Sequence, residues 1–187
     1  MVQTPTRLLT LETFLQQPET KPASEYIDGQ IIQKPMPQGE HSTLQLDFGT
    51  FVNEALKPTK IGRAYTELRC TFGGRSIVPD ISVFRWERIP RELNGRVSNR
   101  FELHPDWVIE ILSPGQSPTK VMRNILYCLD HGTEMGWMID SEESCIFVYQ
   151  PNQTPKFFDE PQMVLPVPAF AGVIEITVKQ LFDWLTD

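Results

Sequence analysis

Cysteine is scarce in this chain of 187 residues, and no apolar run is long enough to cross a bilayer. The three cysteines, Cys70, Cys128 and Cys145, are far apart and form no CxxC pair, which gives no indication of zinc and suggests reduced thiols. The longest apolar stretch, residues 163–174, is interrupted by prolines, and the first residues lack the pattern of a secretion signal. We therefore expect a cytoplasmic protein without a membrane segment.

Positive charge is also in short supply, since 17 Lys and Arg residues face 24 Asp and Glu residues. The net charge of −7 argues against a general electrostatic attraction to nucleic acid. Hydrophobic residues make up 40% of the chain, an ordinary value for a globular protein. With no repeat, low-complexity segment or linker, residues 1–187 are expected to form a single domain.

The pattern of apolar and turn residues predicts helices and strands in alternation. Helices are expected at residues 11–17, 41–56, 118–130 and 178–185, and strands at 25–27, 30–34, 63–72, 76–84, 107–112, 135–140 and 145–150. Asp28-Gly29 and Gly73-Gly74 are typical hairpin turns. This order indicates an α/β (α+β) fold with a mixed sheet flanked by helices.

The segment WVIEILSPGQ, residues 107–116, reads as a buried strand interrupted by one carboxylate, Glu110. Side chains alternate along a strand, so Glu110 shares a face with Val108 and Leu112. The other face carries three apolar side chains, those of Trp107, Ile109 and Ile111. Because both faces are otherwise apolar, a central strand covered on each side is predicted.

Asp80 is a second acid among strand residues, on the same face as Val78, Ser82 and Phe84. Burying an unpaired carboxylate costs several kcal/mol, and two neighbouring acids repel unless a cation bridges them. A divalent metal is one solution. The alternative is an acid paired with an arginine or a backbone donor, or, for Asp80 after Pro79, a solvated position at a strand start.

Three segments together resemble a known family: ELRCTFGGRSIVPDISVF, WVIEILSP and HGTEMGWMID. The resemblance covers about residues 25–150 and is to a restriction-endonuclease family of bacterial domains of unknown function, within the PD-(D/E)xK nuclease superfamily. It implies a restriction-endonuclease-like core with Asp80 and Glu110 on adjacent strands. It also implies that these two acids bind Mg²⁺ (or Mn²⁺) for phosphodiester hydrolysis.

The chain departs from the superfamily pattern at Leu112, where a lysine is expected two residues beyond the second acid. Without a cation there, the attacking water and the transition state lose a stabilising charge. Lys120 in the following helix is the candidate for this role, although the helix dipole disfavours a cation in the first turn by about 0.3–1 kcal/mol. Arg123 is the alternative, and a solvated Lys120 is the simpler reading.

The helix at residues 41–56 and the residue before it offer further candidates. His41 begins the buried stripe of this helix and is either a hydrogen-bonded core residue or a group supporting the metal ligands. A first-helix acid, as in some nucleases of the superfamily, is either Glu40 or Glu54. The sequence does not decide between them.

Residues 84–100 hold five arginines against two glutamates. Because this segment joins the two acid-bearing strands, it is expected beside the site, where arginines contact phosphates and Trp86 stacks on bases. The alternative is a solvated loop with internal Arg–Glu pairs.

We therefore expect a Mg²⁺-dependent endonuclease that acts on nucleic acid, with DNA as the substrate, and in which Asp80, Glu110 and Lys120 are catalytic. Two other functions stay open: a metal-dependent hydrolase of small phosphate esters, and a non-catalytic binding or assembly domain on the same scaffold. A homodimer is expected from exposed strand edges and from analogy with restriction enzymes alone.

Overall fold

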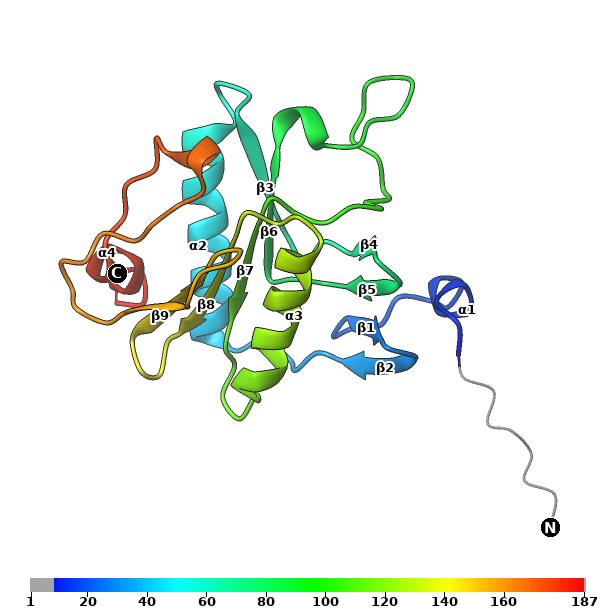
Figure 1. Ribbon diagram of the computed structural model, residues 1–187, viewed down its shortest axis with the longest axis horizontal. Coiled ribbons are helices and arrows are strands. Elements are labelled where there is room, and N and C mark those ends of the chain that lie inside the picture. The colour runs from blue at the N-terminus through cyan, green and yellow to red at the C-terminus, as the bar shows by residue number, and fades with distance from the viewer. Residues whose placement is uncertain (1–8, 187) are drawn as a thin grey trace, which may run out of the picture.

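The computed structural model describes residues 9–186, which fold into two β-sheets and flanking helices (Figure 1). The larger sheet has the strand order β10-β9-β8-β7-β6-β3 and the smaller one the order β2-β1-β5-β4. The strands of the larger sheet are Gly62–Thr66 (β3), Ile81–Arg85 (β6), Trp107–Ile111 (β7), Met135–Asp140 (β8), Cys145–Tyr149 (β9) and Lys156–Phe158 (β10). Those of the smaller sheet are Ser24–Ile27 (β1), Gln30–Gln33 (β2), Cys70–Phe72 (β4) and Arg75–Ile77 (β5).

Helices lie on both faces of the larger sheet (Figure 1). The α-helices of the described part are Leu11–Leu15 (α1), Gly39–Leu56 (α2), Pro118–Asp130 (α3) and Val178–Asp183 (α4), with short 3-10 turns at Trp86–Arg88 and Ala169–Ala171. Helices α2 and α4 pack on the face that carries Trp107, Ile109 and Ile111. Helix α3 packs on the face that carries Val108 and Leu112. The predicted mixed sheet with helices on each side, and the central position of β7, are thereby confirmed.

Local sequence signals account for most element boundaries. Thr10 caps α1 by accepting a hydrogen bond from the Thr13 N–H. Asp28 and Gly29 adopt φ angles of 51° and 83°, as the tight turn between β1 and β2 requires. Helix α3 begins with Pro118 and is followed by Gly132 at a φ of 111°. These predictions hold because each rests on backbone conformations that few residues allow.

The hairpin predicted at Gly73-Gly74 is present, with its two runs paired antiparallel, but each run is broken into two strands. Glu67, with a φ of 51°, separates β3 from β4, and Pro79, which has no N–H for a sheet ladder, lies in the break between β5 and β6. Strands β3 and β6 therefore pair in the larger sheet, whereas β4 and β5 join β1 in the smaller one. Because β1 pairs with β5, the β1–β2 hairpin lies beside Asp80.

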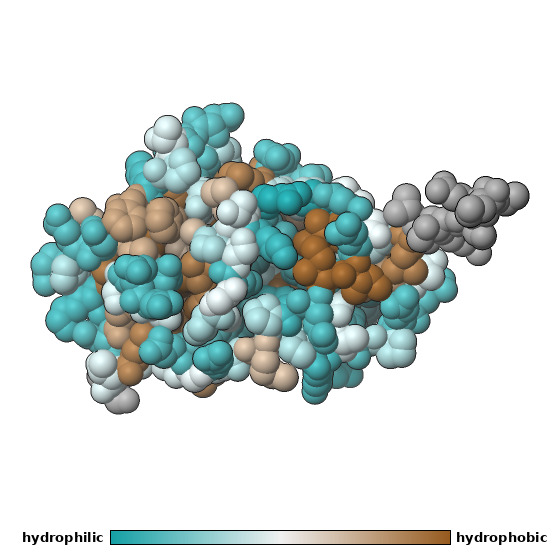
Figure 2. Space-filling model, turned by 90° about the horizontal axis from the view of Figure 1, so that it is seen from below, coloured by the Kyte–Doolittle hydropathy of each residue, from teal (hydrophilic) through white to brown (hydrophobic). Residues whose placement is uncertain are grey.

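Seen from below, the surface is mostly hydrophilic, with an apolar area toward the end of the molecule where Figure 1 places β1 and β2 (Figure 2). Ile31 of the edge strand β2 is 44% exposed. The homodimer expected from such edges stays a prediction. No helix in the described residues combines the length and the apolar character that crossing a membrane requires.

Gly136 provides a test of the packing between α3 and the larger sheet. A Cβ atom there would clash with the buried Ile125 side chain of α3 and lie 3.3 Å from Val108 Cγ1. Gly136→Ala is expected to lower the free energy of unfolding by about 1–3 kcal/mol, measured by urea denaturation. Gly39→Ala is the matched control, because no atom lies within 4 Å of the added methyl group. Equal stability of the two variants would contradict the packing described.

Candidate active site

The two acids singled out from the sequence lie at the same end of neighbouring strands. Asp80 directly precedes β6, and β6 pairs with β7 antiparallel, with Ile81 opposite Ile109. Asp80 Oδ2 accepts a hydrogen bond of 2.7 Å from the Ile111 N–H, which fixes the carboxylate against β7. Asp80 is 2% and Glu110 4% exposed, so both carboxylates are buried and the alternative of a solvated Asp80 does not hold.

The cation between these acids is Lys34, which follows β2 at the end of the first hairpin. Its Nζ atom lies 2.6 Å from Asp80 Oδ1 and 3.8 Å from Glu110 Oε2. The same Nζ donates a hydrogen bond of 2.7 Å to the Val78 carbonyl oxygen. Lys34 therefore bridges the carboxylates, although nothing in its spacing from either acid signals this role in the sequence.

Lys120, predicted as the catalytic lysine, lies elsewhere. It is exposed in the first turn of α3, and among the described residues neither Lys120 nor Arg123 forms an ion pair. Both side chains border a cleft that Glu110 also lines. The lysine beside the two acids is therefore Lys34, which follows β2 of the smaller sheet, and not Lys120 as predicted from the sequence.

Glu25 of β1 is a third buried carboxylate in the cluster, at 5% exposure. Its Oε1 atom accepts a hydrogen bond of 2.8 Å from the Val78 N–H, and Asn124 Nδ2 of α3 donates to Oε2 at 3.3 Å. Burial raises the pKa of Glu25, and the Lys34 ammonium opposes this shift. A role for Glu25 was not predicted from the sequence, because a carboxylate in a short strand next to a hairpin turn is usually solvated.

Burial and charge act differently on the two central acids. Burial would raise the pKa of Asp80, but Lys34, His41 and the Ile111 N–H outweigh it and hold that pKa below its usual range. For Glu110, burial dominates and raises the pKa well above its usual value, against the attraction of Lys34. Burial would lower the pKa of Lys34, yet the surrounding carboxylates raise it. The cluster therefore contains an ionised Asp80 and a charged Lys34. At Glu110, the attraction of Lys34 does not offset the effect of burial on the pKa.

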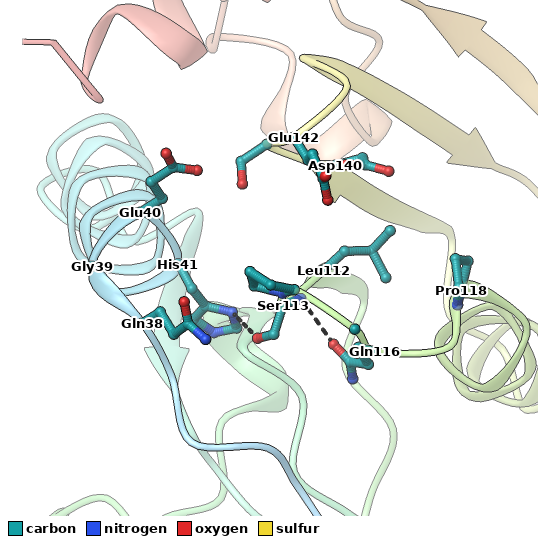
Figure 3. A pocket seen from close by; sticks show the side chains of 13 residues that line it. Gln38, Gly39, Glu40, His41, Leu112, Ser113, Gln116, Pro118, Asp140 and Glu142 are labelled. Carbon is teal, nitrogen blue, oxygen red and sulfur yellow. Dashed lines mark hydrogen bonds between the residues drawn. The ribbon is translucent and has the colours of Figure 1, made fainter.

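His41 occupies the inward position predicted for it at the start of α2. Its Nε2 atom lies 3.3 Å from Asp80 Oδ1 and its Nδ1 atom 3.1 Å from Ser113 Oγ, as the dashed line in Figure 3 marks. His41 is 5% exposed. It therefore links Asp80 to the loop that follows β7, which agrees with a supporting position next to the acids.

The first-helix acids do not join the cluster. Glu40 faces a separate pocket of 710 Å³, across which Asp140 and Glu142 lie (Figure 3). Glu54 is exposed farther along α2. Neither residue lies among those lining the cleft at Glu110, so the acid that accompanies Asp80 and Glu110 in space is Glu25 of β1.

The cluster opens into a cleft of 820 Å³, named here the hairpin cleft, which runs between the β1–β2 hairpin and the first half of α3. Glu25, Lys34 and Glu110 contribute to its lining. The remaining contributors are Ile27, Asp28, Gln30, Ile32, Gln33, Pro35, Arg75, Pro114, Gly115, Gln116, Ser117, Lys120, Val121, Arg123 and Asn124. The loop at residues 114–116 separates this cleft from the pocket at Glu40.

The arginine-rich segment is not beside the site, contrary to the prediction. It leaves β6 at Arg85 and returns at Trp107, the ends of these strands opposite to Asp80 and Glu110. Arg85 pairs with Glu134, and Arg88 pairs with Asp106. The alternative reading, a loop with internal ion pairs, is the better description of this end of the segment.

The donor set fits a divalent cation. Three acidic side chains, those of Glu25, Asp80 and Glu110, surround one ammonium. In the described part of the chain, no backbone N–H or hydroxyl donates a hydrogen bond to the Glu110 carboxylate. No three His, Cys, Asp or Glu side chains there are arranged to hold a metal together. An ion would thus have at most two carboxylate ligands, which is the arrangement Mg²⁺ commonly uses.

Lys34→Met separates the roles of the two lysines. Removing the ammonium leaves buried carboxylates without a counter-charge, so the free energy of unfolding at neutral pH is expected to fall by about 3–5 kcal/mol in urea denaturation. Lys120→Met, the matched control on an exposed helix turn, is expected to change it by less than about 0.5 kcal/mol. Unchanged stability of the Lys34 variant would refute its place as the bridging cation.

The fold agrees with comparisons against known proteins. A solved structure from Anabaena variabilis, described as a "putative nuclease belonging to DUF820", is 59% identical in sequence, with a TM-score of 0.93. The match covers 94% of this chain and 98% of that chain. Among the curated proteins, none matches.

The family comparison bears out the resemblance of the three sequence segments. The Uma2 family model, whose description is "Putative restriction endonuclease", matches residues 11–179. That range contains every residue of the carboxylate cluster and both walls of the hairpin cleft. The chain therefore belongs to the Uma2 restriction-endonuclease family.

Proposed function

We propose that the protein is a divalent-metal-dependent endonuclease that hydrolyses phosphodiester bonds of DNA at the hairpin cleft. The observation that carries the proposal is the convergence of two carboxylates from neighbouring strands on the Lys34 ammonium, with Lys34 and Glu110 lining this cleft. Membership of a family described as a restriction endonuclease supports the same class of reaction.

Asp80 and Glu110 would hold Mg²⁺ or Mn²⁺ through their carboxylate oxygens. A bound ion supplies a water of lowered pKa and polarises a phosphoryl oxygen. In the reaction, the water oxygen bonds to phosphorus, one P–O ester bond breaks, and the leaving oxygen receives a proton. The products are a phosphate monoester and a free hydroxyl group.

Lys34 has two functions in this proposal. Its ammonium keeps Asp80 ionised, because a salt bridge of 2.6 Å favours the charged carboxylate. It also lines the cleft, where a fixed positive charge stabilises the charge that develops on the phosphoryl oxygens. Lys34 thereby replaces the lysine that the superfamily pattern expects at Leu112.

His41 acts through Asp80 and is a positioning residue. Contacts of 3.3 Å to Asp80 and 3.1 Å to Ser113 hold the imidazole between the carboxylate and the loop after β7. Asp80 is consequently restrained from three directions, by His41, Lys34 and the Ile111 N–H. A restrained carboxylate keeps its geometry when a metal ion binds.

Cleavage of supercoiled plasmid and of circular single-stranded DNA tests the proposal. With Mg²⁺ or Mn²⁺ the protein is expected to cut at least one of these substrates, and EDTA should stop the reaction. Asp80→Asn and Glu110→Gln are each expected to lower the rate by at least about 100-fold. Glu142→Gln in the neighbouring pocket is the matched control and should cut as the wild type does.

Three outcomes would redirect the assignment. Cutting that persists in both carboxamide variants would refute the site. Hydrolysis of a small phosphate diester in the absence of DNA cleavage would favour the small-ester hydrolase. Absence of cutting by the folded protein, together with no Mn²⁺ binding in calorimetry, would favour a non-catalytic assembly domain.

A further inference from the structure

We infer that the hairpin cleft admits one unpaired nucleic-acid strand, so that the substrate class is single-stranded DNA and the unpaired segments of duplexes. This inference rests on the proposed function and specifies its substrate. It follows from the depth of the acids, the closure of the cleft, its size and the distribution of charge around it.

Glu110 and Lys34 line the cleft, Asp80 contacts Lys34 without lining it, and neither acid protrudes to the surface. The side chains of Asp80 and Glu110 are 3% and 6% exposed, and that of Lys34 is 11% exposed. A phosphate must therefore enter the cleft to approach them. An unpaired strand can extend a single phosphate into a recess, whereas the backbone of a duplex follows its helical surface.

The cleft is closed along part of its length by direct contact between its walls. Asn124 of α3 donates a hydrogen bond of 3.3 Å to Glu25 of β1. Farther along α3, the Tyr127 hydroxyl donates to the Phe72 carbonyl oxygen at 2.8 Å, and Arg75 lies 4.0 Å from the Tyr127 ring centroid. The smaller sheet and α3 thus meet behind the cluster, and the recess does not continue through the molecule as an open channel at this end.

The size of the recess suits nucleotides. The recess has a volume of 820 Å³. Cavities of about 300–1,000 Å³ typically enclose one drug-sized ligand.

The charged residues around the cleft suit a chain of phosphates, because basic side chains lie at its entrance. The floor is acidic, but Lys120 and Arg123 of α3 border the entrance, both exposed and outside the ion pairs found among the described residues. The other two basic residues of the lining are paired, Arg75 with Asp28 and Lys34 with Asp80. Lys120 and Arg123 lie three residues apart on one helix, a spacing that puts both side chains on the same face.

Labelled oligonucleotides of one sequence, supplied as single strand, as blunt duplex and as duplex with an overhang, test the inference. With Mg²⁺ or Mn²⁺, the single strand is expected to be cut at least about tenfold faster than the blunt duplex, and the third substrate only within its overhang. Cutting of the blunt duplex at the rate of the single strand would overturn the inference and leave the proposed nuclease function intact.

A binding measurement makes the inference testable without catalysis. In fluorescence anisotropy with Mg²⁺, Glu110→Gln is expected to bind the single strand at least about tenfold more tightly than the blunt duplex. If no substrate is cut but this preference is found, the proposed activity fails and the strand preference stands. Equal affinity for both forms, or no binding of either, would refute the preference.

Paired basic variants locate the path of the strand. Lys120→Ala with Arg123→Ala is expected to weaken binding of the single strand and to reduce the slope of log K against log salt by about 1.4, since each phosphate that a side chain neutralises adds roughly 0.7 to that slope. Arg96→Ala with Arg100→Ala, which removes two exposed arginines at the far end of the larger sheet, is the matched control and should leave both quantities unchanged. Equal effects of the two pairs would contradict the path through the hairpin cleft.

Discussion

The rest of this site depends on the contacts that the Lys34 ammonium makes with Asp80 and Glu110. It lies 2.6 Å from Asp80 and 3.8 Å from Glu110, in surroundings where each uncompensated charge is costly. Without it, Glu25, Asp80 and Glu110 would be three buried acids with no positive charge among them. The lysine thereby makes a buried carboxylate cluster compatible with a stable fold.

This dependence gives the smaller sheet its place in the molecule. Strand β1 carries Glu25, and the hairpin that β1 forms with β2 leads directly to Lys34. The break at Pro79 separates β5 from β6, so that Asp80 directly precedes a strand of the larger sheet while β5 pairs with β1. The site therefore lies at the junction of the two sheets, and each sheet contributes charges of the cluster.

The same junction reconciles the net charge of −7 with the phosphate-bearing substrate that we propose. Acidic groups are concentrated in the interior at this end, whereas Lys120 and Arg123 line the entrance to the hairpin cleft. The arginines at the other end of the larger sheet are partly engaged by Asp106 and Glu134. A local basic rim acts over short distances, within the screening length of about 8–10 Å in physiological salt.

Local residue patterns predict the strand around Glu110, the hairpin turn at Asp28-Gly29 and the helix that begins at Pro118. These follow from side-chain alternation and turn chemistry, which operate over a few residues. Only the tertiary structure decided that Lys34 and not Lys120 meets the acids, that Glu25 joins them, and that the arginine-rich segment lies at the far end. Lys34 is 46 residues from Asp80 in the chain, and such a pairing depends on how two sheets pack, for which no local pattern of residues exists.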